Sequence, residues 1–182
     1  MFSFTVSNEI QIELLQQHHK DELFHLIDSN RAHLRKYLLW VDKRQSPKDL
    51  IPIFPVWLKN YAENNGFDAG IRYNGELIGM IGLHYIDWQN KSTSIGYFLS
   101  ESAQGKGIIT RCVASLLDYI FTVLDLYRVE IKCAESNLRS QAIPERLGFT
   151  LEGTIRGSQF LYDHYEDIAV YSMLAPEWNR IR

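Results

Sequence analysis

The chain changes its pattern at a glycine-rich segment, Gln104-Gly105-Lys106-Gly107-Ile108-Ile109-Thr110. The apolar run at residues 95–99, directly before it, predicts a buried strand. After it, apolar residues recur at helical spacing as far as Leu124, which predicts a helix with one buried face. The segment is therefore a predicted strand-to-helix turn. A helix N-terminus offers unpaired backbone N–H groups and partial positive charge, and glycines let a ligand come close, so the turn predicts a phosphate site.

Two better-known phosphate loops do not fit this segment. A Walker loop needs four residues between its first glycine and a Gly-Lys-Ser/Thr, and that spacing is absent. A dinucleotide-binding turn needs a third glycine, where this chain has Thr110, and an acid that closes a second strand. Asp125 has about the right separation, but it falls at the end of the predicted helix. A turn without a ligand stays open as the alternative on these residues alone.

The segment resembles motif A of the GCN5-related N-acetyltransferases (GNAT), Arg/Gln-x-x-Gly-x-Gly/Ala. Gln104 fills the first position and Gly107 the fourth, while Ile109 departs from the sixth. Gly-Lys-Gly-Ile-Ile-Thr is similar instead to the branch that acetylates the N-termini of ribosomal proteins (RimJ/RimL-like). The resemblance continues through Asn137-x-x-Ser140 and through the run from Arg146 to Gly153, and it covers nearly the whole chain.

Composition narrows the class of protein. A chain of 182 residues with 46% hydrophobic content suits one domain, residues 1–182, with a good core. The net charge of -3 implies no bulk attraction to nucleic acid. Two cysteines, Cys112 and Cys133, favour a reducing cytoplasm over a disulfide scaffold. The N-terminus is not patterned as a signal peptide, and no run approaches 18 apolar residues, so we expect a cytoplasmic protein that spans no membrane.

The remaining pattern predicts a mixed α/β (α+β) fold. Asn74-Gly75 between two apolar runs is the strongest local signal and predicts a type I′ hairpin. Ser46-Pro47 predicts a helix start. We expect strands at residues 10–14, 69–73, 77–85, 95–99, 128–134, 149–155 and 167–174. We expect helical segments at 18–38, with a break near Ser29-Asn30, and at 46–61, 109–124 and 137–147. The result is a mostly antiparallel sheet of six to seven strands with about four helices, and a loop at residues 162–164.

The resemblance implies acetyl-CoA as the co-substrate and no metal, with the fourth and fifth strands splayed to admit it. The pyrophosphate would take backbone N–H groups of the turn, and the amides of the pantetheine arm would pair with an exposed strand edge. Asn137 is either a helix cap or also a donor to pantetheine. The expected cofactor-binding residues are Phe98, Leu99, Gln104, Gly105, Lys106, Gly107, Ile108, Ile109, Thr110 and Asn137.

Direct acetyl transfer needs a proton donor for the leaving thiolate and a base for the amine. Many relatives place a Tyr where this chain has Pro144; this proline should free the carbonyl of Ser140. Ser140 is the expected acid, with Tyr162 as runner-up. The ribosomal branch often has a Glu where this chain has Ser94, so His84 is the substitute base.

We therefore expect an N-acetyltransferase that modifies the N-terminal α-amine of a protein, plausibly ribosomal. An α-amine has a pKa near 8 and a lysine near 10.4, so a site without a strong base suits the α-amine better. Two alternatives stay open: a detoxifying enzyme for small amines, with a closed pocket lined by Trp40, Trp57 and Trp88, and a CoA-binding module without turnover. The resemblance also allows a homodimer.

Overall fold

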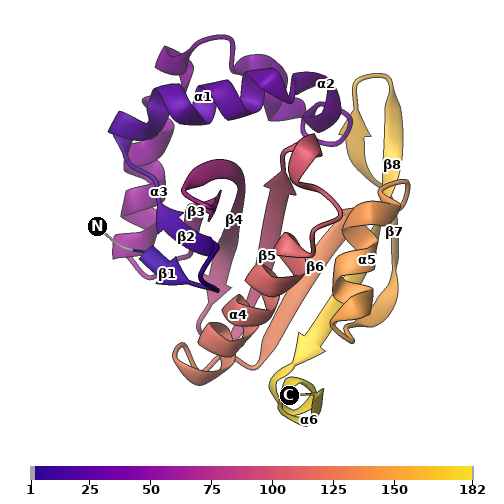
Figure 1. The fold of residues 1–182 in the computed structure, drawn as a ribbon. Coiled ribbons are helices and arrows are strands. Elements are labelled where there is room, and N and C mark those ends of the chain that lie inside the picture. The colour runs from indigo at the N-terminus through magenta and orange to yellow at the C-terminus, as the bar shows by residue number, and fades with distance from the viewer. Residues whose placement is uncertain (1–2, 182) are drawn as a thin grey trace.

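The computed structural model describes residues 3–181 and contains one open sheet of eight strands with helices on both faces (Figure 1). The strands are β1 (Ser3–Thr5), β2 (Ile10–Leu14), β3 (Phe67–Tyr73), β4 (Glu76–Asp87), β5 (Ser92–Leu99), β6 (Arg128–Ala134), β7 (Thr150–Leu161) and β8 (His164–Leu174). Their order is β1-β2-β3-β4-β5-β6-β8-β7, and every neighbouring pair is antiparallel except β5 with β6. The mixed, mostly antiparallel sheet is as predicted.

The described residues form six α-helices and four short 3-10 helices. The α-helices are α1 (Lys20–Ser29), α2 (Arg31–Leu34), α3 (Ile53–Ala62), α4 (Ile108–Thr122), α5 (Leu138–Arg146) and α6 (Ala175–Ile181). The 3-10 helices are η1 (Gln17–His19), η2 (Leu39–Lys43), η3 (Pro47–Leu50) and η4 (Glu101–Ala103).

The break expected near Ser29-Asn30 in the first helical segment is confirmed: the Asn30 side chain bonds the carbonyl of Leu26, and its backbone leaves helical geometry, with φ -113° and ψ 12°. Two differences from the sequence prediction have local causes. The eighth strand is β1, which pairs with β2. The loop expected at residues 162–164 is a tight turn, because β7 and β8 pair as far as Leu161 and His164.

The predicted hairpin between β3 and β4 is confirmed. Asn74 has φ 50° and Gly75 has φ 86°, the positive values that a type I′ turn requires of both central residues. The turn pairs Tyr73 with Glu76, and a shift between Ile71 and Arg72 then moves the register by one residue, so that Ile71 pairs with Gly79. That register places the residues of β4 that face each core.

Two hydrophobic cores lie on opposite faces of the sheet. Met80 and Ile81 are neighbours in β4 whose side chains point to opposite faces. Ile81 belongs to the core beneath α4, which includes Val113 and Leu117. Met80 belongs to the core beneath α1 and α3, which includes Phe54. The sheet therefore has an α4–α5 face and an α1–α3 face.

The strands β5 and β6 pair over three residues and then separate. Ser92, Thr93 and Ser94 pair with residues 128–130, whereas β5 continues to Leu99 without a partner on that side. Its other edge pairs with β4 as far as Leu99. The predicted splay is confirmed, and it leaves one edge of β5 free over its last five residues, 95–99.

Candidate active site

The glycine-rich turn leads into the N-terminus of α4. Gly107 is the residue before the helix, with φ 68°, and Gly105 has φ 76°. A Cβ at either position would meet nothing within 4 Å, so the backbone faces open space. The N–H of Arg111 bonds the carbonyl of Gly107, and the N–H groups of residues 108–110 precede the first helical bond. This arrangement is suited to an anion.

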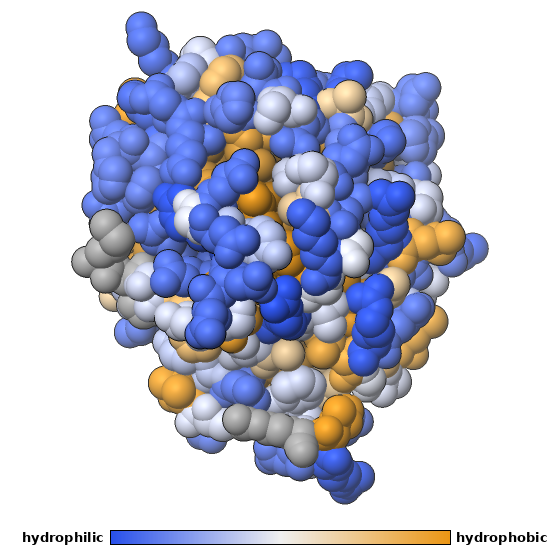
Figure 2. All heavy atoms as spheres, viewed as in Figure 1, coloured by the Kyte–Doolittle hydropathy of each residue, from blue (hydrophilic) through white to orange (hydrophobic). Residues whose placement is uncertain are grey.

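Basic side chains of α5 frame the turn. Arg146 Nη1 donates to Thr110 Oγ1 at 2.9 Å, and Arg139 donates to Gln104 Oε1. His33 lies on the other side of Gln104, with 2.9 Å between its Nε2 and the amide nitrogen. Strongly hydrophilic side chains cover α5 and the start of α4 (Figure 2). Arg139 was not predicted as a site residue, and Arg146 was predicted only as part of a family motif.

Lys106, an expected cofactor residue, points along the hairpin side of the turn. Its ammonium lies 5.5 Å from the centre of the Tyr73 ring, a cation–π contact. The side chain is exposed. Its backbone stays part of the turn, which is where the prediction placed its role.

At the free edge of β5, every second residue has a backbone N–H group without a strand partner. The N–H of Ser100 bonds the carbonyl of Ile78 on β4, so the N–H groups of Tyr97 and Leu99 point to the other, unpaired edge. The side chain of Phe98 turns to the α1–α3 face, where its ring lies 5.6 Å from that of Trp40. Of the two residues predicted at this edge, Leu99 supplies the free N–H.

Ser140 lies across the split from this edge. Asn137 caps α5 by accepting from the N–H of Ser140 at 3.2 Å. Pro144 has no N–H, and the carbonyl of Ser140 accepts instead from Tyr97 Oη at 3.0 Å, so the freed carbonyl is confirmed. Ser140 Oγ lies 3.2 Å from Cys133 Sγ and 3.5 Å from Tyr97 Oη. A serine, a tyrosine and a cysteine thus meet on the α4–α5 face.

Burial keeps this cluster protonated. It raises the pKa of the Tyr97 hydroxyl well above its ordinary value. Burial also raises the pKa of the Cys133 thiol, although hydrogen bonds from Ser140 and Tyr97 oppose the shift. At neutral pH the cluster is therefore a set of proton donors and contains no thiolate nucleophile.

His84 lies on the opposite face of the sheet. A Cβ built on Gly96 would overlap its Cε1 and Nε2 atoms, so the imidazole rests on β5 where that strand has no side chain. Gly96 is two residues beyond Ser94, the last β5 residue that pairs with β6. His84 thus lies beside the point where the strands part, on the face opposite to Ser140.

Tyr162 makes contacts of a different kind. Its hydroxyl bonds the carbonyl of Arg35 at 3.1 Å and Asp42 Oδ2 at 2.9 Å, and the Arg35 guanidinium lies 4.9 Å from its ring centre. These contacts join the β7–β8 turn to the α2–η2 segment. None of them reaches Ser140, and the role of Tyr162 as a proton donor stays a prediction.

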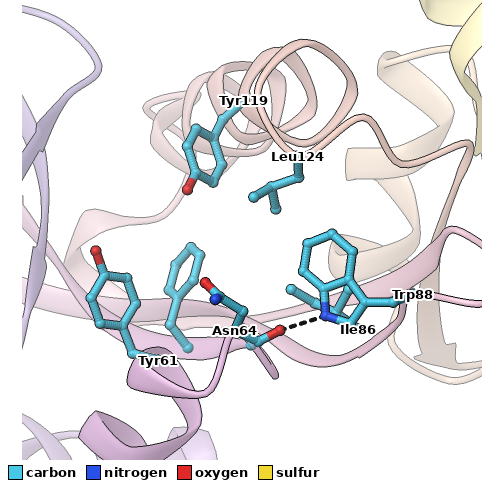
Figure 3. Close-up of a pocket in the computed structure, with 8 residues that line it drawn as sticks. Tyr61, Asn64, Ile86, Trp88, Tyr119 and Leu124 are labelled. Carbon is cyan, nitrogen blue, oxygen red and sulfur yellow. Dashed lines mark hydrogen bonds between the residues drawn. The ribbon is translucent and has the colours of Figure 1, made fainter.

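A separate hollow lies at the other end of β4 (Figure 3). Tyr119 and Leu124 lie on one side of it and Tyr61, Asn64 and Trp88 on the other. Ile86 in its floor pairs with Thr93, at the start of β5, whereas the free edge is at the end of β5. The hollow is therefore distinct from the split.

Trp40, Trp57 and Trp88, which the small-amine alternative places in one closed pocket, do not line one pocket. Trp40 and Trp57 pack against the core of the α1–α3 face, whereas Trp88 borders the hollow and bonds Asn64. Residues 3–181 contain no group of His, Cys, Asp and Glu that could hold a metal ion. No helix in the same range is long and apolar enough to cross a membrane.

Comparisons with known proteins agree with this geometry. The model of the acetyltransferase (GNAT) domain matches residues 10–150. The chain is 38% identical over 179 residues to a putative ribosomal N-acetyltransferase, YdaF, of Bacillus subtilis, covering 98% of each chain. It is 31% identical to the ribosomal-protein-serine acetyltransferase of Escherichia coli, covering 93% of this chain and 94% of that protein.

A solved structure extends the likeness to the bound co-substrate. It is RimL, a ribosomal L7/L12 α-N-protein acetyltransferase in complex with coenzyme A, which is held there in a disulfide with a cysteine. It matches with a TM-score of 0.91 and 26% identity, covering 95% of this chain and 98% of that one. Acetyl-CoA is accordingly the co-substrate of this chain. The protein belongs to the GNAT family of acetyl-CoA-dependent acyltransferases, in its RimJ/RimL-like branch.

Proposed function

We propose that this enzyme acetylates the N-terminal α-amine of a ribosomal protein in the cytoplasm by direct transfer from acetyl-CoA. Relatives named for ribosomal-protein acetylation support the acceptor class. The two cysteines are free and buried, which fits a reducing compartment. The observation that carries the chemistry is the free edge of β5, with Ser140 on one face of the split and His84 on the other.

Each part of acetyl-CoA has matching groups. The pyrophosphate would take the N–H groups at the start of α4, with Arg139 and Arg146 adding positive charge. The amides of the pantetheine arm would pair with the free edge of β5 as a strand does. An N–H group of this edge that the pantetheine arm leaves unpaired, at Tyr97 or Leu99, would stabilise an oxyanion at the thioester carbonyl.

Ser140 is the proposed proton donor to the leaving thiolate. As the amine nitrogen bonds to the acetyl carbon, the carbon–sulfur bond breaks and the thiolate takes the hydroxyl proton, which solvent replaces. Tyr97 holds the Ser140 backbone at 3.0 Å and keeps the hydroxyl beside the split. The net products are the acetylated amine and CoA thiol, with one proton released to solvent when the acceptor starts as its ammonium form.

His84 is the proposed acceptor of the amine's proton. Near pH 7.5, roughly a quarter of an α-amine is already neutral, against about one part in a thousand of a lysine. A site whose only base is one imidazole therefore suits an α-amine better than a lysine amine. We expect His84→Ala to lose less than about a hundredfold in kcat/KM with an α-amine, the low end of base catalysis. A far larger loss with intact acetyl-CoA binding would contradict this account.

The acceptor is tested by intact-mass spectrometry of a bacterial ribosomal extract incubated with acetyl-CoA, with and without the enzyme. We expect one component to gain the mass of a single acetyl group, located by fragmentation at its N-terminus. Acetylation confined to added small amines would replace the ribosomal acceptor with a small-amine one. Acetyl-CoA binding without transfer to any amine would show a silent binding module.

A further inference from the structure

The α1–α3 face carries a half-buried carboxyl, Asp68, that the mechanism above does not use. Asp68 is in β3 and pairs with Gly82 of β4, and Gly82 pairs with Gly96 of β5. Because Gly82 and Gly96 have no side chains, they leave this part of the sheet surface uncovered. A Cβ built on Gly82 would lie 3.1 Å from Asp68 Oδ1, and one on Gly96 would overlap the imidazole of His84. The carboxyl and the imidazole therefore converge over the same pair of glycines.

The carboxyl of Asp68 has no compensating contact. Its pKa is raised by burial, and the charge of His84 is the one influence that opposes the shift. Within residues 3–181 no hydrogen bond or ion pair satisfies this carboxyl, and none joins it directly to His84. The carboxyl oxygens are not among the fully buried atoms that lack a partner, so they are accessible from outside and can accept from a ligand. A group that donates several hydrogen bonds and carries positive charge would suit them.

We propose that Asp68 and His84 together form the site for the acceptor's ammonium group, which rests over Gly82 and Gly96 before acetyl transfer. The proposal deepens the proposed function and rests on it. The ligand class is a primary ammonium, because its three N–H donors can bond both the Asp68 carboxylate and a ring nitrogen of His84. Proton transfer to His84 then leaves the neutral amine beside Gly96, where β5 and β6 part.

The charged groups on the elements around Asp68 and His84 are paired with each other, which leaves these two side chains to bind the ammonium. β5 contributes no titratable side chain on this face, because Ser94, Gly96 and Phe98 occupy it. The carboxylates and bases of neighbouring elements are paired with each other: Glu130 with Arg128 and Lys132, Arg72 with Glu13 and Glu22, and Lys59 with Glu63.

The first test is steady-state kinetics of Asp68→Asn with a short peptide that has a free N-terminal serine. We expect the KM for the peptide to rise at least tenfold while the KM for acetyl-CoA is unchanged. Glu76→Gln, which removes a negative charge from the far end of the same hairpin, is the matched control and should change neither. A peptide KM unchanged in Asp68→Asn would overturn the proposal.

The second test does not need turnover. The imidazole resonances of His84 are assigned by their loss in His84→Ala and followed by NMR as glycinamide, a small primary ammonium, is added. We expect saturable shifts in the wild type that weaken at least tenfold in Asp68→Asn. No shift in the wild type overturns the ammonium site. If shifts occur but no amine is acetylated, the ammonium site stands and the proposed function fails.

Discussion

The strand β5 has two neighbours and pairs with them in very different ways. With β4 it forms a ladder that extends to Leu99, whereas with β6 pairing ends at Ser94. The closed seam fixes which residues of β5 face each side of the sheet. The open seam leaves backbone groups for the co-substrate and lets chemistry reach the acetyl group from both faces. Acetyl transfer in this family thus depends on the point at which the hydrogen-bonded pairing of β5 with β6 ends.

The largest expected effect tests the phosphate end of the open seam. In Gly107→Val, a branched side chain would occupy the space now open and would strain a residue with φ 68°. Loss of two or three charge-assisted hydrogen bonds, at about 1.5–3 kcal/mol each, should weaken acetyl-CoA binding by a factor of about a hundred or more. Isothermal titration calorimetry measures it, with circular dichroism to confirm the fold.

Gly157→Val is the matched control for that variant. Gly157 also has positive φ, 58°, and also faces open space, but it lies in β7. It should suffer similar strain and keep its acetyl-CoA affinity. Equal affinity of Gly107→Val and the wild type would place the pyrophosphate elsewhere.

The next effect concerns the α4–α5 face of the open seam. Ser140→Ala removes the proposed proton donor, and we expect kcat to fall by about a hundredfold, since a thiolate is a fairly good leaving group without help. The acetyl-CoA dissociation constant should not change. Ser136→Ala, which removes a hydroxyl bonded to Glu166, should retain full activity. A Ser140→Ala enzyme with normal kcat would contradict this role and would favour Tyr162 as the proton donor.

Tyr97→Phe tests the group that bridges the open seam. The variant removes one hydrogen bond to the carbonyl of Ser140, which Pro144 leaves free. A lost hydrogen bond of about 1 kcal/mol corresponds to about a fivefold lower kcat. If the effect acts through the position of Ser140, Tyr97→Phe should have no further effect in a Ser140→Ala background. Additive losses in the double variant would show that Tyr97 acts on the reaction by itself.

Features that depend on one or two neighbouring residues were far more accessible from sequence than the open seam. Asn74 and Gly75 predict their hairpin because positive φ at both positions is a local requirement. Gly107 predicts its helix start for the same kind of reason. The point at which β5 and β6 part has no local signal; the family resemblance supplied it.

The site residues divide in the same way. Pro144 predicted the free carbonyl of Ser140, since a proline always lacks the N–H. Its partner Tyr97 is 43 residues away in sequence, and no local pattern connects them. Asp68 was missed because it approaches His84 through the register of three strands and two facing glycines. Distant pairings of this kind require the tertiary fold.

The smallest expected effect concerns the ladder formed by β6, β8 and β7, which lies on the side of β6 away from the open seam. Arg128 of β6 bonds Glu152 of β7, which also accepts from Ser172 of β8 at 2.8 Å. These donors lower the pKa of Glu152 from 4.5 to about 2. Because the folded carboxyl has the lower pKa, its stabilisation is present above pH 4.5 and is lost as the pH falls toward about 2.

Glu152→Gln should therefore lower the unfolding free energy at pH 7 by less than about 1 kcal/mol, because solvent screens the ion pair between Arg128 and Glu152. The melting temperature should fall only slightly. The difference from the wild type should shrink as the pH falls from 4.5 toward about 2, in thermal melts at fixed ionic strength. Acetyl-CoA affinity should be the same in both proteins at pH 7. A loss of affinity instead would mean that the ladder beyond β6 controls how far β5 and β6 separate, and that ladder and the open seam would then be coupled.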